Sequence, residues 1–386
     1  MKLHIFNPEN DLALADGGFS YCPPPAATRI AKDLATLPLW FATAVDAVYL
    51  PDEHHCEYHT AMSSLFSLPT PFLSSMRDGI ISLAPWGWSP QMRHRLKSMG
   101  FDPSLLPTDF QIDELRRLSN RRTSIEILTM LHSQGVDVPP FPCYYTSIDE
   151  VKDFICARER CVIKAPWSGS GKGIMWGIGR VEEAMEHFCR GVIRRQGGIL
   201  CEHYLNPVKE FAMEFFSSGD GVEFAGYSLF TSEKGSYAGN ILLSNAQIEA
   251  RLVELLPGFN FSRLKEMLCG IMQQLLAKSG YVGYFGIDMM IYNNGDGNRL
   301  NPCMELNLRM NMGVVARIFF DRYVAEGACG HYSVSYFKKE GEALNLHLEL
   351  SKSHPLRVLE GRILEGYINL SPVRHESRYI AYAVIE

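Results

Sequence analysis

Apolar and polar positions in the first 110 residues predict short strands separated by helices. Apolar runs at 3–6, 44–50 and 79–85 have the length of buried strands. Residues 26–37 show helical character up to Pro38, and Ser89 and Gly100 are placed to cap and end a further helix. This alternation favours a parallel α/β unit, but no G-x-G-x-x-G turn indicates a dinucleotide site. The polar residues 7–18 predict a loop, either a ligand-binding strand-end loop or an ordinary connection.

The pattern changes near residue 115. An amphipathic helix is expected at 120–135, and two short strands at 160–165 and 174–178 flank a glycine-rich turn. A helix at 181–197, strands at 198–205, 209–217 and 222–231, and a long helix at 262–279 follow. Strands at 284–292 and 299–307 are joined by the turn sequence NNGDGN, which predicts a hairpin. Residues 314–386 are a mixture of helix and strand.

Composition narrows the classes of function. The chain has 386 residues, of which 46% are hydrophobic and 21% are charged, and its formal net charge is −6. This length predicts two or three domains, and the acidic balance argues against a nucleic-acid partner. The longest apolar stretch, 34–50, is interrupted by Pro38 and Asp46, so we expect no membrane span. Ten cysteines without a C-x-x-C pair, and no secretory signal, predict a cytoplasmic protein.

The glycine-rich turn in CVIKAPWSGSGKGIMW (161–176) does not have the pattern of a Walker loop. Gly173 follows Lys172 where that loop needs Ser or Thr, and Pro166 stands where it needs its first glycine. A glycine-rich hairpin tip can instead bring its backbone N–H groups close to an anion. Lys164, in the strand before the tip, would add a positive charge for phosphate oxygens. An ordinary turn with a solvated Lys172 is the alternative interpretation.

The hairpin at 284–307 gives the more specific signal. Folding it about NNGDGN brings Asp288 and Glu305 nearly opposite each other, and Asn307 lies on the same face as Glu305. Two carboxylates beside apolar strands are costly to bury unless a cation joins them, and Mg²⁺ prefers such oxygen ligands. Arg309 falls on the same face and could hold a phosphate or a carboxylate. The alternative is an acidic hairpin that faces solvent, with an ion pair to Arg309.

Taken in order, these segments resemble the ATP-grasp superfamily over about residues 115–315. The resemblance depends on NRRTSIEIL, VIKAPWSGSGKGI, LCEHYLNPVKEFAMEF and GIDMMIY…MELNLRMNMG. It implies an α/β fold of two lobes that sandwich ATP, with a Rossmann-like domain before them. The implied boundaries are 1–114 for that domain, 115–315 for the ATP-grasp core and 316–386 for a C-terminal extension packed on the large lobe. Within the core, the small lobe would cover about 120–205 and the large lobe about 206–315.

The resemblance also implies roles for individual residues. Asp288, Glu305 and Asn307 would bind two Mg²⁺ ions, with Mn²⁺ as an alternative metal. Arg309 and Lys164 would act on the transferred phosphate and on the α- and β-phosphates. Arg122, or alternatively Arg121, matches a basic residue at the start of a helix. The remaining implied ATP contacts are Ser168, Gly169, Ser170, Gly171, Lys172, Glu202, Tyr204 and Leu205, with Glu210 on the ribose.

The activity implied is that of an ATP-dependent ligase that phosphorylates a carboxylate and joins it to an amine, such as an amino acid or a peptide. A thiol nucleophile, a phosphotransferase and a regulatory ATP-binding module are the alternatives. The partners would be small molecules, without nucleic acid or membrane, and the oligomeric state is open, with a homodimer as one candidate. Two features depart from the family pattern: Gly286 stands where many members have arginine, and the segment between the hinge and Glu210 is long for some members.

A few further residues carry weaker signals. His54, His55, Cys56 and His59 could bind a metal if residues 52–59 were helical, but a surface loop is the preferred interpretation. Lys234 could reach a γ-phosphate or be solvated. Glu214 shares a strand face with Glu210 and could support the metal or the ribose, or only face water.

Overall fold

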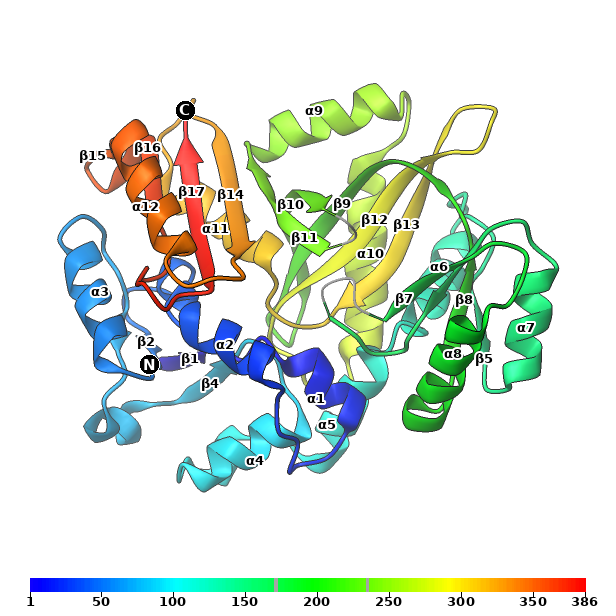
Figure 1. Cartoon of the computed structure of the whole chain (residues 1–386), viewed down its shortest axis with the longest axis horizontal. Coiled ribbons are helices and arrows are strands. Elements are labelled where there is room, and N and C mark those ends of the chain that lie inside the picture. Colours follow the sequence, from blue (N-terminus) through cyan, green and yellow to red (C-terminus); the bar gives the residue numbers. More distant parts are fainter. Residues whose placement is uncertain (170–172, 234–235) are drawn as a thin grey trace.

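The computed structural model describes residues 1–169, 173–233 and 236–386, and the strands in these ranges form three sheets. In Figure 1 the N-terminal elements lie at lower left and the C-terminal strands at upper left. The largest sheet extends from these C-terminal strands through the middle, and a small sheet with its two helices lies at right. The predicted α/β class is confirmed.

The N-terminal sheet is parallel, in the order β3-β2-β1-β4. Its strands are β1 (Lys2–Ile5), β2 (Ala47–Val48), β3 (Thr70–Pro71) and β4 (Ser82–Pro85). The helices of this region are α1 (Asn10–Asp16), α2 (Pro25–Asp33), α3 (Glu53–Ser63), α4 (Pro90–Ser98) and α5 (Asp109–Leu118), with 3₁₀ helices at Leu37–Trp40, Ser74–Gly79 and Pro103–Leu105. Ser89 caps α4 by accepting a hydrogen bond from the Met92 N–H, as predicted. The parallel sheet fits the predicted Rossmann-like domain.

The small sheet is antiparallel, in the order β5-β8-β6-β7. Its strands are β5 (Cys143–Tyr145), β6 (Cys161–Lys164), β7 (Ile174–Gly177) and β8 (Ile199–His203). Helices α7 (Ile148–Cys156) and α8 (Glu183–Gln196) pack on it through a core that includes Phe154 and Cys189. The glycine-rich segment joins β6 to β7, and its residues 170–172 lie outside the described residues.

The large sheet has the order β13-β12-β9-β10-β11-β14-β17-β16-β15. Its strands are β9 (Asn206–Ser217), β10 (Val222–Glu233), β11 (Ser236–Leu242), β12 (Gly283–Asn293), β13 (Asn298–Asn307), β14 (Gly330–Tyr336), β15 (Arg357–Leu359), β16 (Arg362–Asn369) and β17 (Tyr379–Ile385). Strands from the tail therefore continue the same sheet as the predicted hairpin. The predicted domain boundaries themselves stay predictions.

Helices cover both faces of the large sheet. Apolar side chains of α6 (Thr123–Ser133), α9 (Asn245–Leu255) and α10 (Phe261–Leu276) join one core with Phe211, Met213 and Ile287. On the other face, α11 (Met312–Tyr323) packs against Trp40 and other N-terminal residues in a second core. Helix α12 (Glu342–Ser353) lies near β16. The strand face that carries the polar residues of the site therefore meets α11 and the N-terminal region.

Two predicted loops are helices. Residues 10–16 form α1 because leucine and alanine favour helix, Ala13 and Leu14 are buried, and Gly17 ends the helix with a φ of 77°. Residues 53–63 form α3, in which the Asp52 side chain accepts a hydrogen bond from the His55 N–H. The prediction of a loop was wrong at both positions because single polar residues do not outweigh a cap and buried contacts.

Candidate ATP and metal site

The hairpin register places two carboxylates directly opposite each other. Asp288 on β12 pairs with Glu305 on β13, and Gly286 pairs with Asn307. All of these residues share one face of the sheet, because strand side chains alternate. Burial, and after it the charge of Glu305, raises the pKa of Asp288 to about 7, although a hydrogen bond with Asn307 acts to lower it. The geometry brings the two predicted carboxylates and the Asn307 amide together.

A second charged pair lies on the small sheet. Lys164 at the end of β6 is 5% exposed, and its Nζ is 2.7 Å from Oε2 of Glu202 on β8. The other carboxylate oxygen of Glu202, Oε1, is buried without a hydrogen-bond partner. The thiol of the buried Cys303 on β13 has its pKa raised by burial and then by the charges of Asp288 and Glu202, with Lys164 opposing. The Lys164–Glu202 pair on the small sheet and the acids on the large sheet therefore all lie near the Cys303 thiol.

Arg121 connects the two sheets. Its guanidinium donates hydrogen bonds to Ser168 Oγ at 2.6 Å and to Ala165 O at 2.7 Å, and its Nη2 is 3.0 Å from Glu305 Oε2. Its Nε is buried and has no partner. Arg122 is exposed, with its guanidinium 5.2 Å from the Tyr144 ring centroid. Neighbouring residues at a helix start point in different directions, and Arg121, the alternative of the two, is the one beside Glu305. Which arginine contacts ATP stays a prediction.

Arg309 lies at the other side of the acidic pair, where it contacts the N-terminal region. Its Nε is 2.8 Å from Asp11 Oδ1 and its Nη2 is 2.6 Å from Asp11 Oδ2, while Nη2 is also 3.2 Å from Asn307 Oδ1. Burial acts to lower the pKa of Arg309, but the charge and hydrogen bonds of Asp11 outweigh it and hold this pKa above its usual value. Asp11 belongs to α1, in the polar segment that the sequence marked as a candidate ligand-binding loop. Neither residue's local sequence indicates this particular pair.

The other residues predicted to contact ATP have different neighbours within the protein. Gly169 lies against Asp11, since a Cβ on Gly169 would be 3.4 Å from Asp11 Oδ2. Tyr204 carries the Arg160 guanidinium over its ring at 3.6 Å from the centroid, and Leu205 beside it is half-buried. Glu210 on β9 is opposite Met290 and acts on Asp288 through its charge. Ser170, Gly171, Lys172 and Lys234 lie outside the described residues.

Glu214 is a carboxylate whose place the sequence left open. It is 1% exposed, so the alternative in which it faces water is wrong. Asn311 donates a hydrogen bond to its Oε2 at 2.8 Å, and the residue pairs across the ladder with Gly286. Burial is the main cause that raises the pKa of Glu214 to about 8; the hydrogen bond from Asn311 acts to lower this pKa, and the charge of Asp288 acts to raise it.

The histidine cluster on α3 is engaged in protein contacts. His55 Nε2 is 2.9 Å from Lys32 O, and His59 Nε2 is 3.0 Å from Pro69 O. Over residues 1–169, 173–233 and 236–386, no three His, Cys, Asp or Glu side chains come together as a metal site. In the same ranges no helix is long and apolar enough to cross a bilayer.

Solved structures of similar fold identify the fold of this chain. The chain matches N5-carboxyaminoimidazole synthetase from Staphylococcus aureus in complex with ADP (TM-score 0.51, 13% identity, 100% of this chain and 93% of that one). It also matches the corresponding ribonucleotide synthetase from Thermus thermophilus (0.50, 12%, 100% and 94%) and a biotin carboxylase β-γ-ATP complex from Campylobacter jejuni (0.51, 10%, 100% and 87%). The chain thus has the ATP-grasp fold predicted from the sequence. No protein-family model and no curated protein matches it.

Proposed function

We propose that the protein is a Mg-ATP-dependent ligase that activates a carboxylate as an acyl phosphate and joins it to an amine. The observation that carries this proposal is the register that sets Asp288 opposite Glu305, with Lys164 and Arg121 facing them. Two of the matching solved structures are complexes with ADP or β-γ-ATP, which supports a nucleotide as the ligand of this fold.

The donor set fits a divalent cation. The carboxylates of Asp288 and Glu305 lie beside the amide of Asn307, and burial raises the pKa of Asp288. Mg²⁺ commonly binds one or two carboxylates together with substrate phosphates and water. Magnesium bound there would neutralise charge on the phosphate oxygens. Asp288, Glu305 and Asn307 would hold two Mg²⁺ ions, with Mn²⁺ as a substitute.

The protein's own groups position the reactants. Lys164 and Arg121 supply positive charge from the small-sheet side, and Arg309 supplies it from the large sheet. The nucleoside would lie along the segment that leads from β8 into β9. This segment contains Glu202, Tyr204, Leu205 and Glu210. Attack of the substrate carboxylate on the γ-phosphorus gives ADP and an acyl phosphate, and attack of the amine on the acyl carbon releases phosphate. Positioning and charge neutralisation suffice for both steps.

We further infer that the protein works in the cytoplasm on small molecules, because all ten cysteines are free thiols. A homodimer is one candidate for its oligomeric state.

The test is ADP release with a pool of carboxylates and hydroxylamine, which traps acyl phosphates as hydroxamates. Asp288→Asn and Glu305→Gln should each lower the Mg-dependent rate by about 10²–10³-fold. Asp149→Asn, on the exposed face of α7, is the control and should keep the wild-type rate. Unchanged rates in both site variants, with folding verified by circular dichroism, would refute the metal assignment.

Two alternatives have distinct outcomes in the same assay. A phosphorylated product that never yields hydroxamate would indicate a phosphotransferase. MgATP binding without any ADP release in the presence of all acceptors would indicate a regulatory module.

A further inference from the structure

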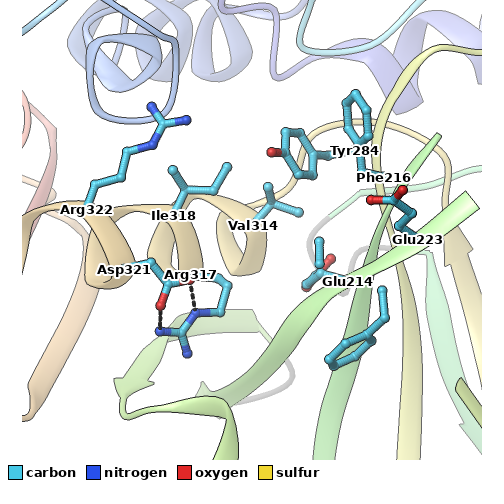
Figure 2. Close-up of a pocket in the computed structure, with 11 residues that line it drawn as sticks. Glu214, Phe216, Glu223, Tyr284, Val314, Arg317, Ile318, Asp321 and Arg322 are labelled. Carbon is cyan, nitrogen blue, oxygen red and sulfur yellow. Dashed lines mark hydrogen bonds and ion pairs between the residues drawn. The ribbon is translucent and has the colours of Figure 1, made fainter. Parts of the chain in front are cut away.

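A cavity of about 300 Å³ opens on the same sheet face as the acidic pair. Its walls come from β9, β10 and β12 on one side and from α11 on the other, as Figure 2 shows. The apolar lining is formed mainly by Phe216, Phe224, Tyr284, Val314 and Ile318. This volume is at the lower end of the range for pockets that hold small molecules.

The cavity continues the line of the proposed nucleotide. Along paired strands β9 and β12, the rungs of this face are Glu210 with Met290, Ala212 with Asp288, Glu214 with Gly286, and Phe216 with Tyr284. Each rung advances by two residues, or about 7 Å. A nucleotide with its ribose at Glu210 and its phosphates at Asp288 would therefore direct its terminal phosphate toward Glu214 and the cavity.

Two glycines make room for the Glu214 carboxylate at the inner end of the cavity. A Cβ on Gly286 would lie 2.4 Å from Glu214 Oε2, and a Cβ on Gly313 would lie 2.3 Å from Oε1. Side chains at either position would displace the carboxylate. Gly286, where the resemblance would place an arginine, therefore leaves that space to the Glu214 carboxylate.

The charges around the cavity favour a cation. On α11, Arg317 donates to Asp321 and, through Nη1, to Leu243 O at 2.6 Å. Arg322 donates to Ala42 O at 2.7 Å. Both arginines are thus directed to partners within the protein, whereas Glu214 and Glu223 line the cavity from β9 and β10. Counting all five charged side chains, three are acidic and two are basic.

We propose that this cavity binds the amine substrate, as a primary ammonium compound whose nitrogen contacts Glu214 and whose apolar body packs against Phe216, Tyr284 and Val314. The proposal rests on the proposed ligase function and adds the chemical class of its second substrate. Glu214 is here a binding residue on the acceptor side and is distinct from the residues that hold metal and phosphates.

The test measures binding of phenethylamine to the full-length protein by ligand-observed NMR, with 3-phenylpropionate as the anion of similar shape. The amine should bind the wild type and the anion should not. Glu214→Gln should weaken amine binding by about 10- to 100-fold, because it removes a charge-assisted hydrogen bond. Ala225→Leu, which fills the cavity from β10, should weaken it comparably, and the exposed Glu266→Gln should leave it unchanged.

Calorimetry with MgATP completes the design. Glu214→Gln should keep the wild-type affinity for MgATP within about threefold; a joint loss of MgATP and amine binding would place Glu214 in the metal site and overturn the proposal. Unaltered amine binding in Glu214→Gln and Ala225→Leu, or preference for the anion, would overturn it as well. Failure of the ligase function shows separately, as a wild type that binds the amine but releases no ADP with any acceptor.

Discussion

At the scale of single residues, Glu214 is an unusual buried acid. Its carboxylate is almost wholly removed from solvent, and its Oε2 accepts a hydrogen bond from the Asn311 amide. Burying a charge in this way is costly unless a partner compensates for it, so the ligand-free fold favours the neutral form, whereas an ammonium group bound beside Glu214 would favour the charged form. The proton that Glu214 holds therefore links the stability of the protein to pH.

The first prediction concerns this linkage. The folded-state pKa of Glu214 is raised from 4.5 to about 8, so its proton stabilises the fold fully below about pH 4.5, and this contribution is lost as pH rises through 8. Between about pH 5 and about pH 8, the free energy of unfolding of the wild type should fall relative to that of Glu214→Gln by at most about 1.4 kcal/mol per pH unit. Urea unfolding without nucleotide measures the difference.

Glu266→Gln is the matched control, because it removes an acid from the exposed face of α10. Its unfolding free energy should follow that of the wild type at every pH. Parallel curves for wild type and Glu214→Gln would show that Glu214 ionises normally in the folded protein.

The acidic pair was predictable from the sequence, whereas the arginines around it were only partly so. The turn sequence and strand alternation placed Asp288 opposite Glu305, and the structure has that register. Choosing Arg121 over Arg122 requires the direction of each side chain at the start of α6. The contact of Asp11 with Arg309 joins residues 298 positions apart, so local patterns carry no information about it.

At the scale of elements, the first residues of α11 are explained by their contacts with Glu214 on β9. Asn311 caps the helix by accepting from the Val314 N–H, and its amide group donates to Glu214. Gly313 follows in the first turn, where glycine weakens a helix relative to alanine. The close approach to Glu214 and Ser228 accounts for this glycine.

The second prediction compares two glycines in helices. A Cβ at Gly313 would lie 2.3 Å from Glu214 Oε1 and 2.4 Å from Ser228 Oγ, while a Cβ at Gly270 in α10 meets nothing within 4 Å. Gly313→Ala should therefore destabilise the protein by about 1–3 kcal/mol, as overpacking does. Gly270→Ala should stabilise it by up to about 1 kcal/mol through helix propensity. Chemical denaturation gives both values, and equal effects would contradict the close approach at α11.

Helix α1 shows why element prediction failed near the N-terminus. The segment from Asn7 to Gly18 contains proline, asparagine and glycine, which are typical of loops. Its leucines and alanines form a short helix because the side chains of Ala13 and Leu14 on this helix are buried. Tertiary burial decided the structure of seven residues whose composition was ambiguous.

At the scale of the whole molecule, the ATP-grasp fold was predictable from four segments, but the extent of the large sheet was not. Strand β14 joins the sheet beside β11, and β17 lies beside β14, so residues far apart in the sequence pair with each other, such as Asn240 with Tyr332. The tail carries no motif that indicates this pairing. The N-terminal region then packs on the opposite side of α11, in a core that contains Trp40 and Phe319.

Asp11 and Arg309 connect that N-terminal region to the proposed site. The two side chains are 19% and 16% exposed, and two nitrogens of the guanidinium face the carboxylate. Bidentate pairs of this kind are stronger than single contacts, and partial burial limits screening by water. The pair should therefore couple the two parts of the chain energetically.

The third prediction measures that coupling by a double-mutant cycle. Asp11→Ala, Arg309→Ala and the double variant should give an interaction energy of about 1–3 kcal/mol, since the charged partner left behind is partly buried. The control cycle uses Arg357 and Glu365, whose contact is also short at 2.8 Å but whose side chains are 65% and 52% exposed. Exposed pairs contribute little, so that cycle should give at most about 0.5 kcal/mol. Equal coupling in the two cycles would mean that the N-terminal helix is held on the site by its apolar core alone, and that Arg309 is free of Asp11 in solution.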